Sequence, residues 1–269
     1  MPNLSLPFVG FERGYFLDIQ CFFPNKQLIG HKILAGPCNC RCYYCHRRDF
    51  LEKRFPDVPV NEILIRLREL EYYNTVVVTG GEITLHFKAA ISIMNALQAE
   101  GITTLFSTNG LFPDRVTAMC QYADAVKIDI KDTRGKYRDT SGQDAYDLVM
   151  ESLSNASRFT NVEFKIIIHE HTTKDDIEAI LRDVKSATGF PSNVAVQFQP
   201  VRDFLNAGLI EPSINNVMMM CAEANPRPQI ALLKHYGTVE RIYRLIDEDW
   251  IVFREKEIPL RFDWGTPHE

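Results

Sequence analysis

The stretch NTVVVTGGEITLHFKAAISIMNALQAEG, residues 74–101, decides the fold class of this 269-residue chain. It begins with a β-branched run that ends in two glycines, and apolar residues then recur every three or four positions from Phe87 to Leu97. The first pattern predicts a buried strand, and the second predicts an amphipathic helix that ends at Gly101. A strand followed directly by a helix is the repeating unit of a parallel α/β sheet.

The same unit recurs on both sides of this stretch. Strands are expected at 30–36, 74–81, 102–110, 124–132, 162–170 and 193–200. Helices are expected at 61–72 with Asn61 as the cap, after 86, near 115–122 and 144–156, around 177–184 and at 214–223. Six units with short connections predict parallel strands, but they fall short of the eight units of a closed barrel. We therefore predict an α/β fold, a partial (β/α)6 barrel of parallel strands with a small C-terminal helix-strand extension.

Two segments outside these units complete the expected organisation. Residues 1–224 are predicted to form the barrel domain, with a core at 30–202, and FLDIQCFF at 16–23 is expected to add a strand. Residues 225–269 are predicted to form the extension, in which 250–253 read as a strand. Its expected purpose is to cover the open barrel edge or mouth, because an uncovered edge strand exposes unpaired backbone groups.

Composition narrows the range of partners and compartments. The chain is 45% hydrophobic and 24% charged, with a net charge of -5, so it has no basic excess that would indicate a nucleic acid as main partner. The first residues lack the basic start and apolar run of a secretory signal, and no apolar stretch approaches the length of a membrane span. We expect a cytoplasmic protein without membrane contact.

The sequence GPCNCRCYYCHRRDF, residues 36–50, holds four of the seven cysteines. Cys38, Cys42 and Cys45 have the spacing C-x3-C-x2-C, and Cys40 lies between them. Thiolates are soft donors that bind zinc or iron–sulfur clusters. A structural zinc site needs four ligands, usually from two separated pairs, so a zinc site that includes Cys40 is one alternative and a redox dithiol is another. Three thiols on a four-iron cluster would leave one iron open.

This spacing, on a loop after the first barrel strand, resembles the signature of the radical S-adenosylmethionine (SAM) superfamily. The resemblance implies a [4Fe–4S] cluster on Cys38, Cys42 and Cys45, whose open iron binds the amino and carboxylate groups of SAM. One electron from the cluster would cleave SAM to methionine and a 5′-deoxyadenosyl radical that abstracts hydrogen from a substrate. It also implies that Tyr44 lies against the adenine and that Cys40 is a bystander.

Further cofactor contacts are expected where the predicted strands end. TGGE resembles the family's GGE motif, which implies contacts to the SAM amino group from the backbone and an added charge from Glu82; a tight turn is the alternative. Lys127, Asp129 and Lys131 alternate onto one strand face, where they need partners if buried. The expected cofactor-binding residues, beside Tyr44, are Thr79, Gly80, Gly81, Glu82, Ser107, Asn109, Asp129, Lys131, Lys165, Gln197 and Gln199. The alternatives are an Asn-Gly β-turn for Asn109 and a surface ion-pair cluster for the charged residues. His169 and His171 are expected to be surface polar residues, and a role as proton donors or metal ligands is the alternative.

Several segments resemble the glycyl-radical activating enzymes, in particular those that serve anaerobic ribonucleotide reductase. These segments are Cys-His after the cluster loop, KIDIKD followed by TRGKYRDTSG at 127–142, and QFQP at 197–200. The resemblance implies a glycyl-radical enzyme as protein substrate and a one-electron donor such as flavodoxin or ferredoxin, which Arg47 and Arg48 would help to dock. Arg47 and Arg202 depart from the Asn and His of these enzymes. A radical SAM enzyme that acts on a small molecule, nucleoside or peptide is the alternative, and a zinc-stabilised binding module is the third.

Overall fold

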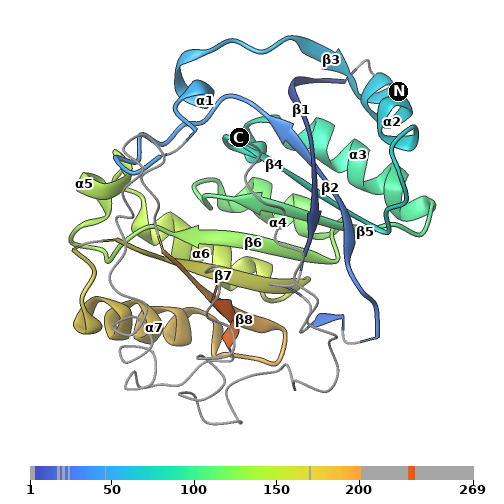
Figure 1. The fold of residues 1–269 in the computed structure, drawn as a ribbon. Coiled ribbons are helices and arrows are strands. Elements are labelled where there is room, and N and C mark those ends of the chain that lie inside the picture. Colours follow the sequence, from blue (N-terminus) through green and yellow to red (C-terminus); the bar gives the residue numbers. More distant parts are fainter. Residues whose placement is uncertain are drawn as a thin grey trace, which may run out of the picture.

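The computed structural model describes residues 4–16, 19, 22–23, 25–45, 47–169, 171–200 and 230–233. Within this part of the chain the strands form one nine-stranded sheet in the order β3-β1-β2-β4-β5-β6-β7-β8-β9 (Figure 1). The strands are β1 (Ser5–Tyr15), β2 (Ile29–Ala35), β3 (Asp57–Pro59), β4 (Thr75–Gly80), β5 (Thr103–Thr108), β6 (Ala125–Ile130), β7 (Asn161–Ile168), β8 (Val194–Pro200) and β9 (Ile230–Leu233). The helices are α1 (Asp49–Glu52), α2 (Val60–Arg68), the 3₁₀ helix η2 (Ile83–His86), α3 (Phe87–Ala99), α4 (Pro113–Cys120), α5 (Tyr137–Ser141), α6 (Tyr146–Ala156) and α7 (Lys174–Thr188).

The predicted α/β fold with parallel strands is confirmed. Strands β2, β4, β5, β6, β7, β8 and β9 pair in parallel, and β1 pairs antiparallel with both β2 and β3. The sheet therefore has a seventh parallel strand, β9, where the sequence predicts six. The apolar run that forms β9 is only four residues long and falls in the predicted extension, and so short a run carries no clear period. Its pairing with β8 places it at the sheet edge that the extension was expected to cover.

Two local predictions need correction, and others fall outside the described residues. Helix α2 begins at Val60 after Pro59, so Asn61 lies inside its first turn rather than capping it, and α2 ends at Arg68. The added N-terminal strand is β1, upstream of 16–23; Phe16 and Ile19 lie beyond its end, and both are buried in an apolar cluster. The predicted elements at 214–223 and 250–253 lie outside the described residues, as do His46 and Arg202.

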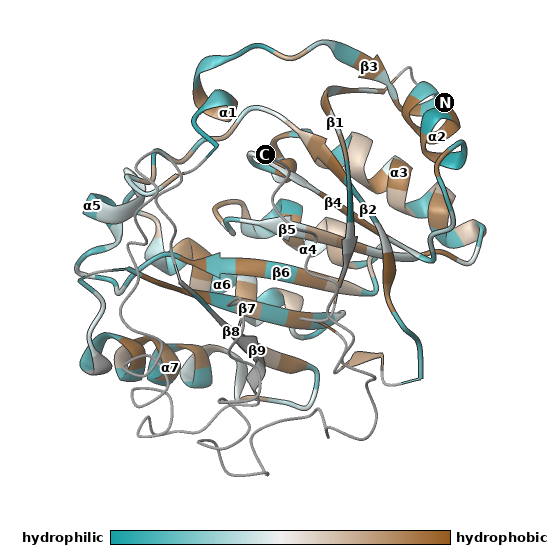
Figure 2. Cartoon of the chain, viewed as in Figure 1, coloured by the Kyte–Doolittle hydropathy of each residue, from teal (hydrophilic) through white to brown (hydrophobic). Residues whose placement is uncertain are grey.

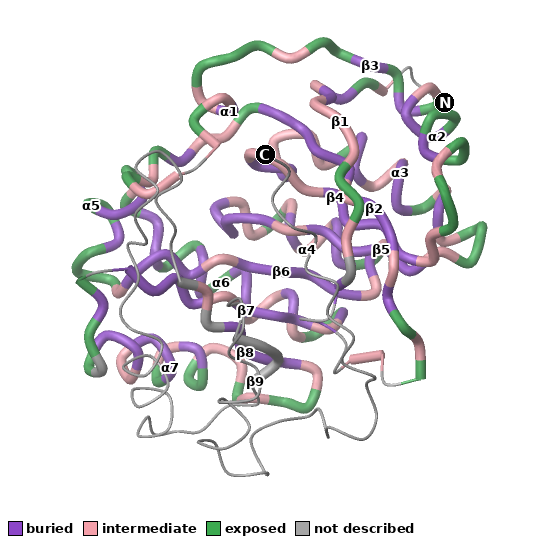
Figure 3. Tube along the Cα trace, viewed as in Figure 1, coloured by how far each residue is buried: buried purple, intermediate pink, exposed green. Residues whose placement is uncertain are grey.

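The two faces of the sheet differ in chemistry. Helices α2, α3, α4, α6 and α7 cover one face in a row in which each contacts the next. Along β6, Val126, Ile128 and Ile130 face these helices and join the main core, whereas Lys127 and Asp129 alternate onto the opposite face. Figure 2 shows teal, hydrophilic bands on both β6 and β7, and Figure 3 shows that most of both strands is nevertheless buried.

The face turned away from the helices is closed at its N-terminal end by apolar side chains. Phe16, Ile19, Leu28, Val77, Leu105 and Ala125 form a separate buried cluster there. Polar and charged residues occupy the same face nearer the C-terminal ends of the strands, which is the end that carries the chemistry in barrels of this kind. Among the described helices, none combines the length and the apolar character that crossing a membrane would require.

Candidate functional site

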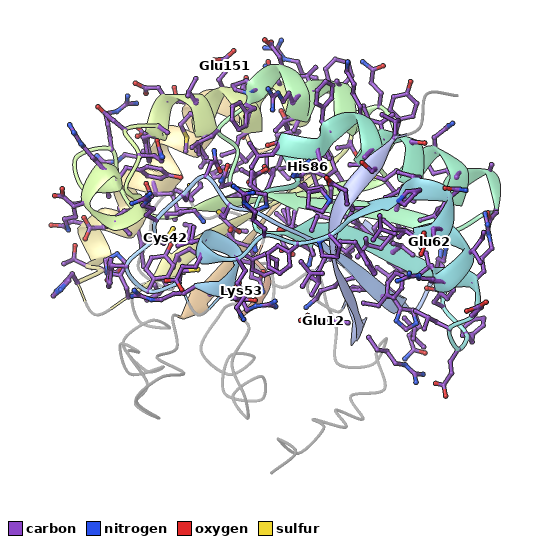
Figure 4. All side chains as sticks on the ribbon, turned by 90° about the horizontal axis from the view of Figure 1, so that it is seen from above. Glu12, Cys42, Lys53, Glu62, His86 and Glu151 are labelled. Carbon is purple, nitrogen blue, oxygen red and sulfur yellow. The ribbon has the colours of Figure 1, made fainter. Side chains whose placement is uncertain are left out.

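The cysteine loop follows β2 and is fixed by backbone hydrogen bonds at several points. The N–H of Cys38 donates to the carbonyl of Phe50 at 3.1 Å, and the N–H of Arg41 donates to the carbonyl of Ser141 at the end of α5 at 2.8 Å. The side-chain amide of Gln143 donates to the carbonyl of Asn39 at 2.7 Å. Figure 4 shows Cys42 of this loop with other sulfur atoms close to it.

The four thiols of this loop have different environments. Cys38, Cys42 and Cys45 are partly exposed, whereas Cys40 is only 2% exposed. The hydrogen bond from Cys40, opposed by burial and aided by the Lys131 ammonium, lowers the pKa of Cys42 to about 6. A hydrogen bond with Cys40 likewise lowers the pKa of Cys38, and burial raises the pKa of Cys45. A thiolate at neutral pH is the form that binds metal.

The donor set fits an iron–sulfur cluster. Among the described residues, no three Cys, His, Asp or Glu side chains meet around the point that a single metal ion would occupy. A [4Fe–4S] cluster makes a different demand, because each cysteine binds a different iron. Three partly exposed thiols on one loop, with a cation beside them, meet that demand, and the burial of Cys40 sets it apart from the other three.

Gly80 and Gly81, at the end of β4, lie against the backbone of the cysteine loop. Gly80 has φ +136°, and a Cβ there would lie 1.9 Å from the carbonyl oxygen of Ala35. A Cβ on Gly81 would lie 2.5 Å from the carbonyl oxygen of Pro37. The N–H groups of Gly81 and Glu82 donate to these two carbonyls at 2.8 and 3.0 Å. The close approach that the glycines permit is thus to the chain's own cysteine loop, and contact with SAM stays a prediction.

Glu82 is 1% exposed, and its carboxylate is bonded within the protein. It accepts hydrogen bonds from the N–H and hydroxyl of Thr84, the hydroxyl of Thr108 and the N–H of Asn109, at 2.5 to 2.9 Å. Burial raises the pKa of Glu82, and these hydrogen bonds oppose the rise. The carboxylate therefore joins the ends of β4 and β5 rather than presenting a free charge.

Asn109 and Ser107 come from β5 and the residues that follow it. The side-chain amide of Asn109 donates to Asn39 at 2.7 Å and to the sulfur of Cys40 at 3.2 Å. Asn109 thus contacts the cysteine loop directly, and its side chain is buried. Ser107 lies in register with Lys127 of the neighbouring β6 and is half-buried.

Asp129, Lys131 and Lys165 form a charged triad at the ends of β6 and β7. The Lys165 ammonium lies 2.6 Å and the Lys131 ammonium 3.2 Å from the Asp129 carboxylate. Burial raises the pKa of Asp129, but the two cations outweigh it and lower that pKa to about 2. The partners that SAM was expected to supply are thus present within the triad, which still keeps one excess positive charge. Lys131 is also close enough to the cysteines to lower the pKa of Cys42.

Two further predicted residues lie on β8. Gln197 is fully buried in register with Lys165, and among the described residues no hydrogen-bond partner contacts its amide. Gln199 is half-buried in register with Ile167.

A second buried ion pair lies two positions before Asp129 and Lys165 on the same strands. The Lys127 ammonium lies 3.7 Å from the Glu163 carboxylate, and both side chains are buried. Glu163 was not among the predicted residues; the sequence signal for it is the alternation in VEFK, where Glu163 lies two positions before Lys165, and the structure places it in register with Lys127.

His169 has an environment different from the one that the sequence predicted. It was expected at the surface, but it is 2% exposed and its Nε2 lies 3.0 Å from Asp132. The N–H of His171 donates to its Nδ1 at 3.3 Å, so Nε2 carries the proton toward Asp132 when the ring is neutral. The ring also stacks on Tyr44 with centroids 6.4 Å apart. The aspartate at the end of the neighbouring strand is the signal for this pair.

Arg47, a predicted docking residue, is engaged within the protein. Its guanidinium pairs with Asp49 at 3.1 Å and with Glu12 at 3.3 Å, and it lies over the ring of Phe50 at 4.2 Å. Arg48 is exposed and donates to the carbonyl of Tyr43 at 3.2 Å. Arg48 is thus the more accessible of the two.

Comparisons with known proteins match the part of the chain that holds this site. The profile described as the Radical SAM superfamily matches residues 33–184, which include the cysteine loop, the β4 glycines and the charged triad. A 7-carboxy-7-deazaguanine synthase of Halobacterium salinarum is 24% identical over 162 residues, which are 58% of this chain and 63% of that protein. A putative glycyl-radical enzyme activating enzyme of Methanocaldococcus jannaschii is 31% identical over 104 residues, which are 38% of this chain and 43% of that protein.

A solved structure extends the similarity to the fold. Streptococcus suis SuiB bound to its precursor peptide SuiA superposes with a TM-score of 0.53 at 11% identity, over 65% of this chain and 39% of SuiB. At this identity the likeness concerns the fold alone. The matched regions span less than two thirds of the length of either curated relative.

Proposed function

Because the chain belongs to the radical SAM superfamily, we propose that it binds a [4Fe–4S] cluster through Cys38, Cys42 and Cys45 and cleaves SAM to start radical chemistry. The bound cluster supplies one electron that splits SAM into methionine and a 5′-deoxyadenosyl radical. The observation that carries the proposal is the position of a charged triad with one excess positive charge beside three partly exposed thiols.

The residues of the triad have distinct proposed roles in holding SAM. Lys131 and Lys165 bind its carboxylate, since the excess positive charge of the triad suits one additional anion. Asp129 keeps both ammonium groups in place, and its carboxylate accepts a hydrogen bond from the amino group or the ribose hydroxyls of SAM. Tyr44, stacked against His169, bounds the adenine. Gln197 and Gln199 lie on the neighbouring strand and reach the adenosine.

The proposed substrate is a glycine residue of a partner enzyme, as in glycyl-radical activating enzymes. Support comes from the similarity to a protein of that name and from the KIDIKD segment, which the structure shows at the barrel end beside the cysteine loop. A one-electron donor such as flavodoxin or ferredoxin completes the reaction. Arg48, exposed next to the cysteine loop, is a candidate contact for an acidic donor.

A small molecule as substrate is the second candidate. The similarity to 7-carboxy-7-deazaguanine synthases of three species, at 24%, 28% and 32% identity, favours it. Under this proposal the amide of Gln197, which has no hydrogen-bond partner among the described residues, would face the substrate or the adenosine in the barrel interior. The two proposals share every step up to the radical and differ only in which hydrogen is removed.

One experiment tests the shared part and separates the two substrates. The protein is reconstituted anaerobically with iron and sulfide, reduced, and supplied with SAM, after which 5′-deoxyadenosine is quantified. A glycyl-radical signal in electron paramagnetic resonance (EPR), on adding a candidate partner enzyme, supports the activase. 5′-Deoxyadenosine formed only when a small molecule or nucleoside is added supports the second candidate. Absence of an iron–sulfur cluster from reconstituted protein would reject both.

A further inference from the structure

Cys40 lies at the centre of the thiol group but faces the protein interior. It is 2% exposed, and its thiol is within hydrogen-bonding reach of the sulfurs of both Cys38 and Cys42. Its own backbone N–H points to the sulfur of Cys38 at 3.5 Å. Residue 40 thus contacts two of the three proposed ligands without sharing their exposure.

Asn109 determines which hydrogen bonds the Cys40 thiol can make. The Oδ1 of Asn109 accepts from the N–H of Leu111 at 3.2 Å, so the other end of this amide must be the NH2 group. That NH2 donates to Asn39 at 2.7 Å and to the Cys40 sulfur at 3.2 Å. A thiol sulfur can accept a hydrogen bond from one partner and donate its S–H to a second. The sulfurs of Cys38 and Cys42 are the acceptors within its reach.

We infer that Cys40 is a positioning and tuning residue, whose side chain, held by Asn109 against the ligand sulfurs, donates a hydrogen bond to one of them and raises the reduction potential of the cluster. The inference rests on the proposed ligands Cys38, Cys42 and Cys45. Hydrogen bonds to cluster sulfurs favour the reduced state, because reduction adds negative charge to those sulfurs. Asn109 holds the donor in place from β5, so the tuning links the cysteine loop to the neighbouring strand.

The test compares four proteins after anaerobic reconstitution: the unchanged chain, Cys40→Ala, Cys40→Ser and Cys120→Ala. Cys120 is the matched control, since it is equally buried at 2% exposure but lies on α4, away from the loop. Iron content measures whether the cluster binds, and an EPR-monitored redox titration measures its midpoint potential. Removal of the small Cys40 sulfur leaves the backbone bonds of the loop in place, so all four proteins are expected to fold.

All four proteins are expected to bind the cluster with the same iron content. Cys40→Ala should lower the equilibrium constant for reduction about tenfold, or about 59 mV for a one-electron couple. Cys40→Ser keeps a donor and should stay closer to the unchanged chain, and Cys120→Ala should not shift. An unchanged potential in Cys40→Ala overturns the inference, and loss of iron in that variant shows that Cys40 is a ligand instead. Failure of the unchanged chain to bind a cluster would count against the proposed function.

Discussion

Asp129 holds two ammonium groups that would otherwise repel each other. Replacing it by Asn leaves Lys131 and Lys165 close together with no carboxylate between them. Because these groups are largely buried, we expect Asp129→Asn to lower the free energy of unfolding at pH 7 by on the order of 2 kcal/mol. Urea denaturation of the variant and the unchanged chain measures the difference.

The same pair of proteins gives a pH test. The pKa of Asp129 in the folded protein is about 2, below the ordinary value for aspartate, so its stabilising effect is complete above about pH 4 and is lost as the pH falls toward 2. The difference in stability between Asp129→Asn and the unchanged chain should therefore be constant from about pH 7 to 5 and shrink below about pH 4. Asp139→Asn, at an exposed position, is the control and should show little difference throughout. A difference that kept its full size down to pH 2 would point to packing rather than charge.

Cys42, one of the three proposed ligands, has a pKa lowered to about 6, so its thiolate form is well populated at neutral pH. Cys42→Ala should abolish the iron–sulfur absorbance after anaerobic reconstitution and lower SAM cleavage by at least about a hundredfold, since two thiols cannot hold the cluster. Iron content, absorbance and 5′-deoxyadenosine are the measurements. Cys120→Ala is the control, as in the test of Cys40. Full iron content in Cys42→Ala would show that the ligands were assigned wrongly.

At the scale of elements, the site depends on how closely the end of β4 approaches the cysteine loop. Gly81→Ala would place a methyl group 2.5 Å from the carbonyl of Pro37, which is backbone and cannot rotate away. We expect the loop to shift, the free energy of unfolding to fall by about 2 to 4 kcal/mol, and cluster content after reconstitution to fall with it.

Gly135→Ala is the matched control for this substitution. A Cβ at Gly135 meets nothing within 4 Å, and the residue is exposed. Its stability and iron content should match those of the unchanged chain. If Gly81→Ala also kept both, the close approach would not be what fixes this loop.

Sequence patterns predicted the elements whose signal is local. The β-branched run of β4 and the helical period of α3 lie next to each other in the chain, and both elements formed where the pattern indicated. Glu82 shows where local patterns stop, because its partners Thr108 and Asn109 come from another strand, 26 and 27 residues away. His169 is hidden for the same reason: its partner Asp132 is 37 residues distant. Such roles depend on register between strands, which a single sequence does not contain.

At the scale of the whole molecule, the sheet face away from the helices is graded along the strands. Apolar side chains such as Val77 and Leu105 close it at one end, the Lys127–Glu163 pair lies in the middle, and the charged triad and thiols occupy the other end. This gradient places the charged groups where a bound cofactor is expected and keeps solvent out of the opposite end. The alternation in KIDIKD predicted which residues share this face, but not that they pair across strands.

The contribution of the Lys127–Glu163 pair, in the middle of this face, to the stability of the protein can be measured. Both side chains are buried, with 7% and 0% exposure, so removing one partner leaves a charge in the interior. Lys127→Met should lower the free energy of unfolding by about 3 to 5 kcal/mol, and Glu163→Leu should have a similar effect. The double variant carries neither charge, so its loss should be much smaller than the sum of the two single losses.

Urea unfolding of all four proteins at pH 7 completes this double-mutant cycle. The exposed Arg66–Glu62 pair on α2 serves as the comparison, because Arg66→Met should change stability by less than about 0.5 kcal/mol. If the losses from Lys127→Met and Glu163→Leu simply added, each side chain would be stabilised by separate contacts and the pair would contribute no coupling. A strong coupling would instead mean that the two buried charges stabilise each other across β6 and β7.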